Sequence, residues 1–202
     1  MDVLSLLAVA AAAAFVLKSI DQRRRIALLG RHLRDYRIEK LMEDLTQGYL
    51  RALGEGDPQR RAQIWPLLGP AEASLAGQFG QFAAAFARVA PEEARISTLP
   101  VALPFADRWL PSATFDARQA FAIHARGIAA AAANERGRSP KDRAFVLMAE
   151  MLLMQHTCHW FCRSRMVATA RMQARHQTRY AQLVDAVDPE TRRAYAALVG
   201  LR

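Results

Sequence analysis

The sequence has few cysteines and lacks the short motifs of the common enzyme classes. Its two cysteines, Cys158 and Cys162, lie close together, so there is no disulfide framework of the kind found in small secreted domains. We find no Walker loop, dinucleotide fingerprint, serine elbow or zincin motif. Isolated carboxylates such as Asp107 and Glu150 are too unspecific to assign as catalytic acids or bases. We therefore expect no catalytic residues and no cofactor.

Lysine is also scarce, since it occurs only at Lys18, Lys40 and Lys141. Arginine consequently supplies most of the 28 basic residues, which exceed the 19 acidic ones and give a net charge of +9. Such an excess favours a partner of negative charge, which includes nucleic acid, an anionic leaflet or an acidic protein. A composition rich in arginine and alanine is also typical of a GC-rich genome, and this second origin weakens the charge as evidence of function.

Motifs of nucleic-acid-binding proteins are absent as well. We find no helix-turn-helix, zinc finger or aromatic stacking platform, so nucleic acid is not the partner we expect. Two basic groups remain candidate binding sites for an anionic ligand, for which lipid headgroups are the expected chemistry. The simpler interpretation is that each group is a solvated helix face. These groups are Arg23, Arg24 and Arg25, and the i, i+4, i+8 set Arg171, Arg175 and Arg179.

One long apolar run without charge is present, from Val3 to Leu17. Extended to Ile20, it provides about 18 helical residues, near the lower limit for crossing a bilayer. A secretory signal has positive charge before its apolar region, whereas only Asp2 precedes this one and a basic cluster follows it. The pattern predicts a retained membrane anchor over residues 1–20. The alternative is an alanine-rich helix buried in a soluble oligomer.

The positive charge flanks this run on one side only. Eight of the first forty residues are basic, and all eight follow the run. The positive-inside rule then predicts a single-pass protein of the inner (plasma) membrane, with its N-terminus outside and residues 21–202 in the cytoplasm. The two cysteines do not form the disulfide framework typical of a secreted protein, and this is consistent with a reducing compartment.

Helical spacing of apolar residues continues beyond the anchor. It predicts one continuous helix up to Leu53, ended by the turn residues Gly54–Pro58. A short helix is expected to follow, capped by Asp57 and interrupted by Pro66, and Gly69–Pro70 then starts a longer one. This longer helix carries the clearest amphipathic stripe in the chain, formed by Leu75, Phe79, Phe82, Phe86 and Val89.

Proline excludes a continuous helix over residues 91–111, which contain three Leu-Pro pairs. Large apolar residues make this segment too apolar for a solvated linker, so we expect it to pack on the body or to reach the membrane interface. Long loops of this kind often carry function. We therefore predict a partner-binding surface at Leu103, Phe105 and Trp109.

Capping residues predict the helices that follow this loop. Ser112 or Thr114 is expected to cap a helix that ends near Ala133 and carries His124 on its polar surface. The longest helix after the anchor should then begin at a serine cap followed by proline, Ser139–Pro140, and a final short helix at Asp188–Pro189.

We extend this longest helix from Pro140 to about Val184. Glu150, Gln155 and two histidines interrupt its apolar residues before they reach a bilayer's length, so a second membrane span is excluded. As the central helix of a bundle, it can be apolar on most of its sides.

One face of this helix carries the one group of residues that suggests metal or redox chemistry. Thioether, thiolate and imidazole groups fall within an arc of about 100° and suit Cu(I) or haem iron. A single helix cannot surround a metal, however, and methionine and cysteine are also ordinary core residues, so packing is the favoured interpretation. The candidate ligands are Met151, Cys158, His159 and Cys162 on this face, together with His156 on the same helix.

Together these patterns predict an all-α fold, in which a single-pass transmembrane helix continues into a juxtamembrane helix (residues 21–56) and a helical domain follows (residues 57–202). The favoured function is a non-enzymatic, membrane-tethered adaptor or assembly component that binds a protein partner, or a second copy of itself, through helix packing. The alternatives are a soft-metal or redox protein using Cys158, His159 and Cys162, and a membrane-proximal binder of lipid or nucleic acid.

Overall fold

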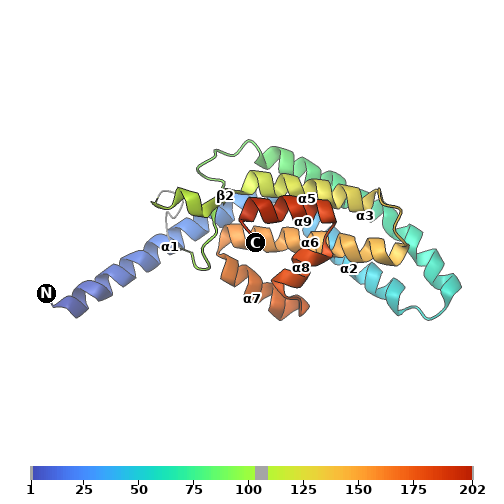
Figure 1. Ribbon diagram of the computed structural model, residues 1–202, viewed down its shortest axis with the longest axis horizontal. Helices are drawn as coiled ribbons and strands as arrows, with labels where there is room; N and C mark the ends of the chain where they lie inside the picture. Colours follow the sequence, from blue (N-terminus) through green and yellow to red (C-terminus); the bar gives the residue numbers. More distant parts are fainter. Residues whose placement is uncertain (1, 103–108, 202) are drawn as a thin grey trace.

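The computed structural model describes residues 2–102 and 109–201 and confirms an all-α fold with a long N-terminal apolar helix and a helical bundle (Figure 1). Two three-residue strands and one 3-10 turn accompany the helices of the described residues. In chain order the elements are α1 (Val3–Leu33), α2 (Ile38–Gly54), α3 (Pro58–Phe86), β1 (Arg95–Ser97), η1 (Pro111–Ala113), β2 (Thr114–Asp116), α5 (Ala117–Ala132), α6 (Pro140–Cys162), α7 (Arg165–His176), α8 (Tyr180–Ala186) and α9 (Pro189–Val199).

Helix α1 has a projecting half and a packed half. Asp2 caps its first turn by accepting a hydrogen bond from the Ser5 N–H (2.8 Å). Residues 2–17 are all exposed and extend away from the bundle (Figure 1), whereas Gln22 and Leu29 are buried against it. The apolar run and the start of the basic juxtamembrane segment therefore form one continuous helix, as predicted.

The helix that we predicted to run on through α2 breaks after Leu33, so that prediction is wrong. Tyr36 donates its N–H to the Leu33 carbonyl (3.0 Å), and its ring packs edge-on against Phe82. The N–H of Arg37 donates to Gln78 Oε1 (2.7 Å). Because the turn changes the direction of the chain, α2 packs along α3 instead of continuing α1. The apolar spacing is helical on both sides of the break, so it could not show the turn.

Pro66 and Pro70 lie inside α3 and do not interrupt it, which corrects the prediction of two separate helices. Both prolines are exposed, so the carbonyls that lose their helical partners, those of Ala62 and Pro66, face solvent and can bond water. The opposite side of α3 packs against α2 and α5. The predicted cap is confirmed, since Asp57 accepts a hydrogen bond from the Gln59 N–H (2.9 Å).

The segment between α3 and α5 is not a simple loop. Strands β1 and β2 pair antiparallel, with Ile96 opposite Phe115 and both side chains buried. The cap of α5 is Asp116, which accepts from the Arg118 N–H (2.8 Å), and not Ser112 or Thr114 as predicted. Strands of three residues are too short to show an alternating pattern, which explains why sequence reasoning missed them.

Helix α6 contacts α1, α2, α5, α7, α8 and β1 and is the central helix that we predicted, but it ends at Cys162. Ser164 then caps α7 by accepting from the Val167 N–H (3.3 Å), and the Met166 N–H donates to the Pro100 carbonyl (3.1 Å). The prediction of one helix that includes α7 and α8 is therefore wrong. No glycine or proline marks the break in the sequence.

The core is built around phenylalanines. Helix α5 lies between α3 and α6, and all residues of the predicted α3 stripe are buried. Phe121 of α5 meets Phe86 at a ring-centroid distance of 4.9 Å with nearly perpendicular planes, a favourable aromatic geometry. The rings of this cluster are Phe79, Phe82, Phe86, Phe121 and Phe161.

Candidate functional site

The projecting half of α1 carries eight exposed large apolar side chains, Val3, Leu4, Leu6, Leu7, Val9, Phe15, Val16 and Leu17. Among the described residues α1 is the one helix that is long and apolar enough to cross a membrane, and none of its apolar span is buried in the body. Val3, Leu4 and Phe15 are each more than 70% exposed. Exposed apolar surface of this extent marks a membrane or a protein interaction site.

The basic cluster that follows this span is only partly free. Arg23 is exposed. Arg24 forms an ion pair with Glu93, and Arg25 donates from Nε to Asp21 Oδ2 (3.0 Å). Arg25 is therefore committed to local structure, while Arg23 presents its charge to solvent beside the apolar span.

An open apolar groove of about 360 Å³ lies where α1, α2 and α6 meet, and we call it the α1–α2–α6 groove. Four polar residues, Gln155, His159, Arg163 and Arg171, lie along the α6 and α7 side, and Glu39 lies on α2. Gly30, Cys158 and Cys162 also line the groove. Its larger apolar side chains come from three helices, namely Ile26, Leu29, Leu33, Ile38, Met42 and Met154.

The five predicted metal ligands do not come together. Cys158, His159 and Cys162 line the α1–α2–α6 groove, whereas Met151 and His156 do not and are buried in the bundle. Nε2 of His156 lies 3.1 Å from the Thr169 hydroxyl, and its ring stacks on Tyr180. In the described part of the chain, no group of three or more His, Cys, Asp and Glu side chains could hold a metal ion.

Both thiols are in an environment that opposes ionisation. Burial raises the pKa of Cys162 to about 11, and burial also raises the pKa of Cys158, whose S–H points to Met154 Sδ at 3.9 Å. Burial lowers the pKa of His159, as do the neighbouring charges of Arg171 and Arg175. Because the thiolate is the metal ligand and nucleophile, thiols that stay protonated at neutral pH are poorly suited to either role.

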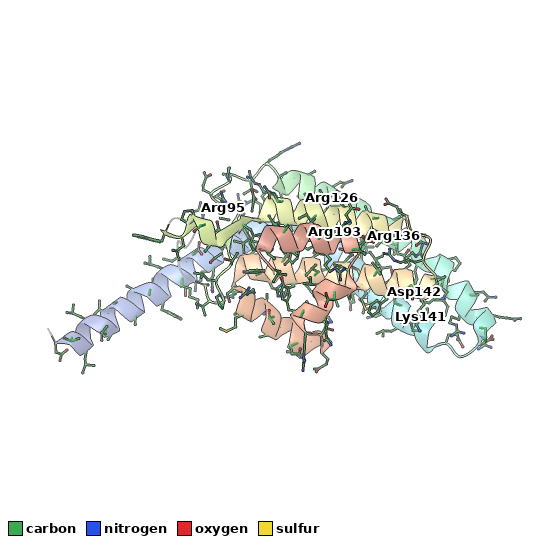
Figure 2. The ribbon with its side chains drawn as sticks, in the orientation of Figure 1. Arg95, Arg126, Arg136, Lys141, Asp142 and Arg193 are labelled. Atoms are coloured by element: carbon green, nitrogen blue, oxygen red, sulfur yellow. The ribbon has the colours of Figure 1, made fainter. Side chains whose placement is uncertain are left out.

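The predicted arginine ridge is divided by the end of α7. Arg171 and Arg175 lie on α7 and are exposed, and Arg171 Nη1 lies 3.3 Å from His159 Nδ1. The chain then turns at Gln177, which adopts a left-handed conformation, and Arg179 precedes α8 as its N-terminal cap. Figure 2 labels four other arginines, of which Arg95 lies apart from Arg126, Arg136 and Arg193.

Of the predicted partner surface, Leu103 and Phe105 fall outside the described residues. Trp109 is described and its side chain is 79% exposed. It is therefore available to a partner or to the membrane interface, where tryptophan is frequent.

Sequence reasoning missed a buried polar cluster in the bundle. His124, which we predicted on the polar surface of its helix, is fully buried, and its Nε2 lies 2.9 Å from the Thr157 hydroxyl. That hydroxyl also lies 3.2 Å from the hydroxyl of Tyr195. Burial lowers the pKa of His124 to about 3, so the ring is neutral. The signal was present, because His124 stands three residues after Phe121 on the apolar face of α5.

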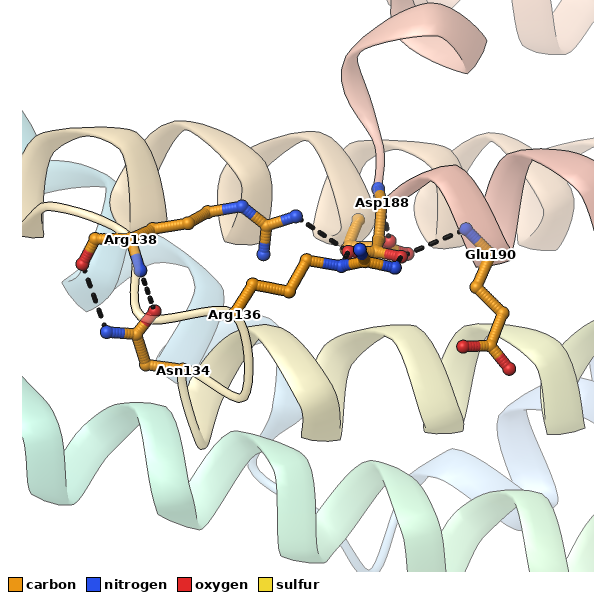
Figure 3. A network of polar contacts seen from close by, with 6 residues as sticks. Asn134, Arg136, Arg138, Asp188 and Glu190 are labelled. Atoms are coloured by element: carbon orange, nitrogen blue, oxygen red, sulfur yellow. Dashed lines mark hydrogen bonds and ion pairs between the residues drawn. The ribbon is translucent and has the colours of Figure 1, made fainter.

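A second missed cluster is centred on Asp188 (Figure 3). Its carboxylate accepts hydrogen bonds from Arg136 Nε and Arg138 Nη2, both at 2.6 Å, and from the Glu190 N–H. Although burial opposes ionisation, the bonds from Arg136 and Arg138 hold the pKa of Asp188 at about 2. The backbone N–H of Asp188 donates to Glu150 Oε1 (3.0 Å). This network ties the α5–α6 loop to the start of α9 and has a structural role.

Glu150 makes the stability of this network depend on pH. Burial raises the pKa of Glu150 to about 7 from an ordinary value of 4.5. The folded protein therefore keeps Glu150 protonated at pH values at which the unfolded chain ionises it. The free energy of unfolding has its full value below pH 4.5 and falls by about 3 kcal/mol as pH rises through 7. We expect the Glu150→Gln variant to lack this loss, because an amide stays neutral and its carbonyl can still accept from Asp188.

Denaturant titration of the full chain in mild detergent at pH 5 and pH 8 measures the effect as the difference in free energy of unfolding. Glu135→Gln is the matched control, since Glu135 is exposed on the neighbouring loop. It should keep the pH dependence of the wild type. An unchanged pH dependence in Glu150→Gln would show that Glu150 is ionised in the fold.

Comparison of the chain with known proteins gives no relative from which the role of this site could be inferred. No family model, curated protein or solved structure matches the chain.

Proposed function

We propose that this protein is a non-enzymatic, membrane-tethered adaptor or assembly component. In this proposal α1 crosses the inner membrane with its N-terminus outside, and the helical body lies in the cytoplasm and binds a protein partner. The observation that carries the proposal is the complete exposure of residues 2–17 on a helix whose second half is packed on the body. An apolar helix half without contacts to its own body requires an apolar environment elsewhere.

The composition of this helix half supports a partner within the membrane. Ala8 and Ala10–Ala14 provide small side chains, which let another membrane helix approach closely. The partner is then a membrane protein or a second copy of this chain. Arg23, which is exposed just after the span, fits anionic lipid headgroups on the cytoplasmic side.

The two alternative functions have less support. A soft-metal or redox role needs ligands that converge, and the predicted set is divided between the α1–α2–α6 groove and the interior. Nucleic-acid binding needs a continuous basic surface, and the ridge of Arg171, Arg175 and Arg179 is divided between two helices.

Membrane insertion is tested by placing charge in the projecting half. We expect the double variant Leu7→Arg, Ala11→Arg to leave the membrane, because each arginine at the centre of a bilayer costs about 2.5–3.5 kcal/mol or more. Carbonate extraction of membranes should release this variant and retain the wild type. Leu7→Phe with Ala11→Leu keeps the span apolar and is the matched control. Release of the wild type would show that α1 packs against protein and not lipid.

Orientation and partner are tested separately. Phosphatase fused after Arg202 should be inactive, and a fluorescent protein at the same place should fluoresce, if the body is cytoplasmic. Affinity purification of the full chain in mild detergent should retrieve a stoichiometric membrane protein or a homo-oligomer. A clean monomer, or an active phosphatase, would contradict the adaptor proposal.

A further inference from the structure

We infer that the α1–α2–α6 groove is a binding site for one single-chain anionic amphiphile, an acyl chain with a negatively charged head. The chain would lie on the apolar floor and the head would lie beside Arg163 and Arg171. This ligand site is distinct from the protein-partner surface proposed above.

Buried apolar side chains form the floor of the groove. Leu29, Ile38 and Met154 are at most 5% exposed and supply one apolar side chain from each of the three helices. Ile26 is 41% exposed on the wall, so apolar surface remains open to a ligand. Preformed apolar pockets with a few polar groups at one end are the usual form of small-ligand sites.

The charge at the α6 and α7 side suits an anionic head. Neither Arg163 nor Arg171 has an ion-pair partner among the residues that the structure describes. Arg163 donates to the neutral Gln22 side chain (2.6 Å), and Arg171 lies beside His159. Glu39 is the one carboxylate that lines the groove, so two guanidinium groups outweigh it. A cationic head would gain nothing from this arrangement.

The size of the groove indicates a single chain. Its volume of about 360 Å³ lies at the lower end of the range of about 300–1,000 Å³ for small-molecule pockets. A stable protein interface instead needs about 800 Å² of surface on each partner. An acyl chain is thus a better fit than a docked helix.

The position of the groove gives a route for the ligand, in a step that rests on the proposed membrane anchor. Ile26 follows the end of the proposed anchor at Ile20 by six residues, about 9 Å along a helix. The headgroup layer of each leaflet is about 5–8 Å thick. The groove therefore opens just beyond the headgroups, where a single-chain amphiphile leaving the leaflet would reach it.

Cys158 and Cys162 report on occupancy, because they line the groove and are the two cysteines of the chain. The full chain is placed in nanodiscs of zwitterionic lipid, and alkylation by iodoacetamide is followed by intact mass at about pH 9, because the raised pKa of Cys162, about 11, leaves too little thiolate at neutral pH. Dodecanoate below its micelle concentration should slow alkylation at least fivefold, whereas dodecyltrimethylammonium and inorganic phosphate should change the rate less than twofold. Native mass spectrometry of the detergent-purified chain should show one dodecanoate per chain.

Two variants test the two ends of the site. Gly30 lines the groove, and a Cβ added there meets nothing within 4 Å, so Gly30→Phe should fill the groove without disturbing the fold and abolish the dodecanoate adduct. Gly77→Phe, at another open helical glycine, is its control. Arg171→Gln should weaken dodecanoate binding at least tenfold. Arg193→Gln on α9, which is labelled in Figure 2 and does not line the groove, should leave binding unchanged.

Several results would overturn the inference. Equal protection by dodecyltrimethylammonium would show that the groove does not recognise an anionic head. Equal protection by inorganic phosphate would show that the ligand needs no acyl chain. Absence of protection by dodecanoate would contradict the proposed binding site. Protection that rises with protein concentration in the absence of ligand would assign the groove to a second copy. These outcomes leave the membrane proposal intact, because that proposal is tested by carbonate extraction.

Discussion

Replacing Phe121 by alanine is expected to lower the free energy of unfolding by about 3–5 kcal/mol, the cost typical of a phenylalanine removed from a core. Phe121 is fully buried at the centre of the aromatic cluster, with ring contacts to Phe79, Phe82 and Phe86. Because these rings come from α3 and Phe121 from α5, the substitution leaves a cavity between two helices that cannot close without moving one of them.

Denaturant titration of the full chain in mild detergent measures this loss. Phe145→Ala is the matched control, since Phe145 is 64% exposed on α6, and its effect should stay within about 0.5 kcal/mol. Equal effects of the two substitutions would mean that the aromatic cluster is not the core of the fold.

Replacing Arg143 by methionine should destabilise the protein by about 3–5 kcal/mol, because it leaves a buried charge without its partner. Glu72 is 1% exposed, and Nη2 of Arg143 lies 2.9 Å from its Oε2 as an ion pair. Its other oxygen accepts a hydrogen bond from the Tyr49 hydroxyl (2.7 Å). This triad joins α2, α3 and α6, so the unpaired carboxylate would weaken the contact of all three helices.

A double-mutant cycle separates the charge from the shape of the side chain. Glu72→Gln should partly restore stability in the Arg143→Met background, because it removes the buried charge. Arg192→Met is the control for an exposed pair, since Arg192 lies 3.6 Å from an exposed Asp185, and its effect should be at most about 1 kcal/mol. A loss no larger for Arg143→Met than for Arg192→Met would show that Glu72 needs no counter-charge.

Local signals predicted where three of the described helices, α3, α6 and α9, begin. Asp57, Ser139 and Asp188 each stand before a proline, and each caps a helix in the structure. These predictions succeeded because a cap depends on a side-chain oxygen and a backbone N–H only two or three residues apart. The α3 stripe was readable for the same kind of reason, since helical spacing places its members on one side.

Helix ends and turns were less predictable. The breaks after Leu33 and Cys162 occur without glycine or proline, and they depend on contacts with distant residues, Gln78 for the first and Pro100 for the second. Conversely, Pro66 does not end a helix, because its position on the solvent side of α3 lets the freed carbonyl face water. Which side of a helix is solvated is a property of the packed bundle.

The candidate sites show the same division. The apolar run at residues 3–17 was evident from the sequence alone, because a continuous stretch without charge needs no partner segment to be recognised. Of the suspected metal ligands, spacing correctly placed Cys158 and Cys162 on one side of α6. That side faces α1 and α2, and no periodicity within α6 could reveal its neighbours.

The amino-acid sequence by itself therefore determined the helical class, the apolar span, the caps at Asp57, Ser139 and Asp188, and the main core stripe, because each depends on residues within a few turns of one another. The tertiary structure alone decided that Glu150 is buried, that Glu72 meets Arg143, and that three helices enclose an apolar groove. These features join residues tens of positions apart, and their energies arise only when packing excludes water from the groups between them.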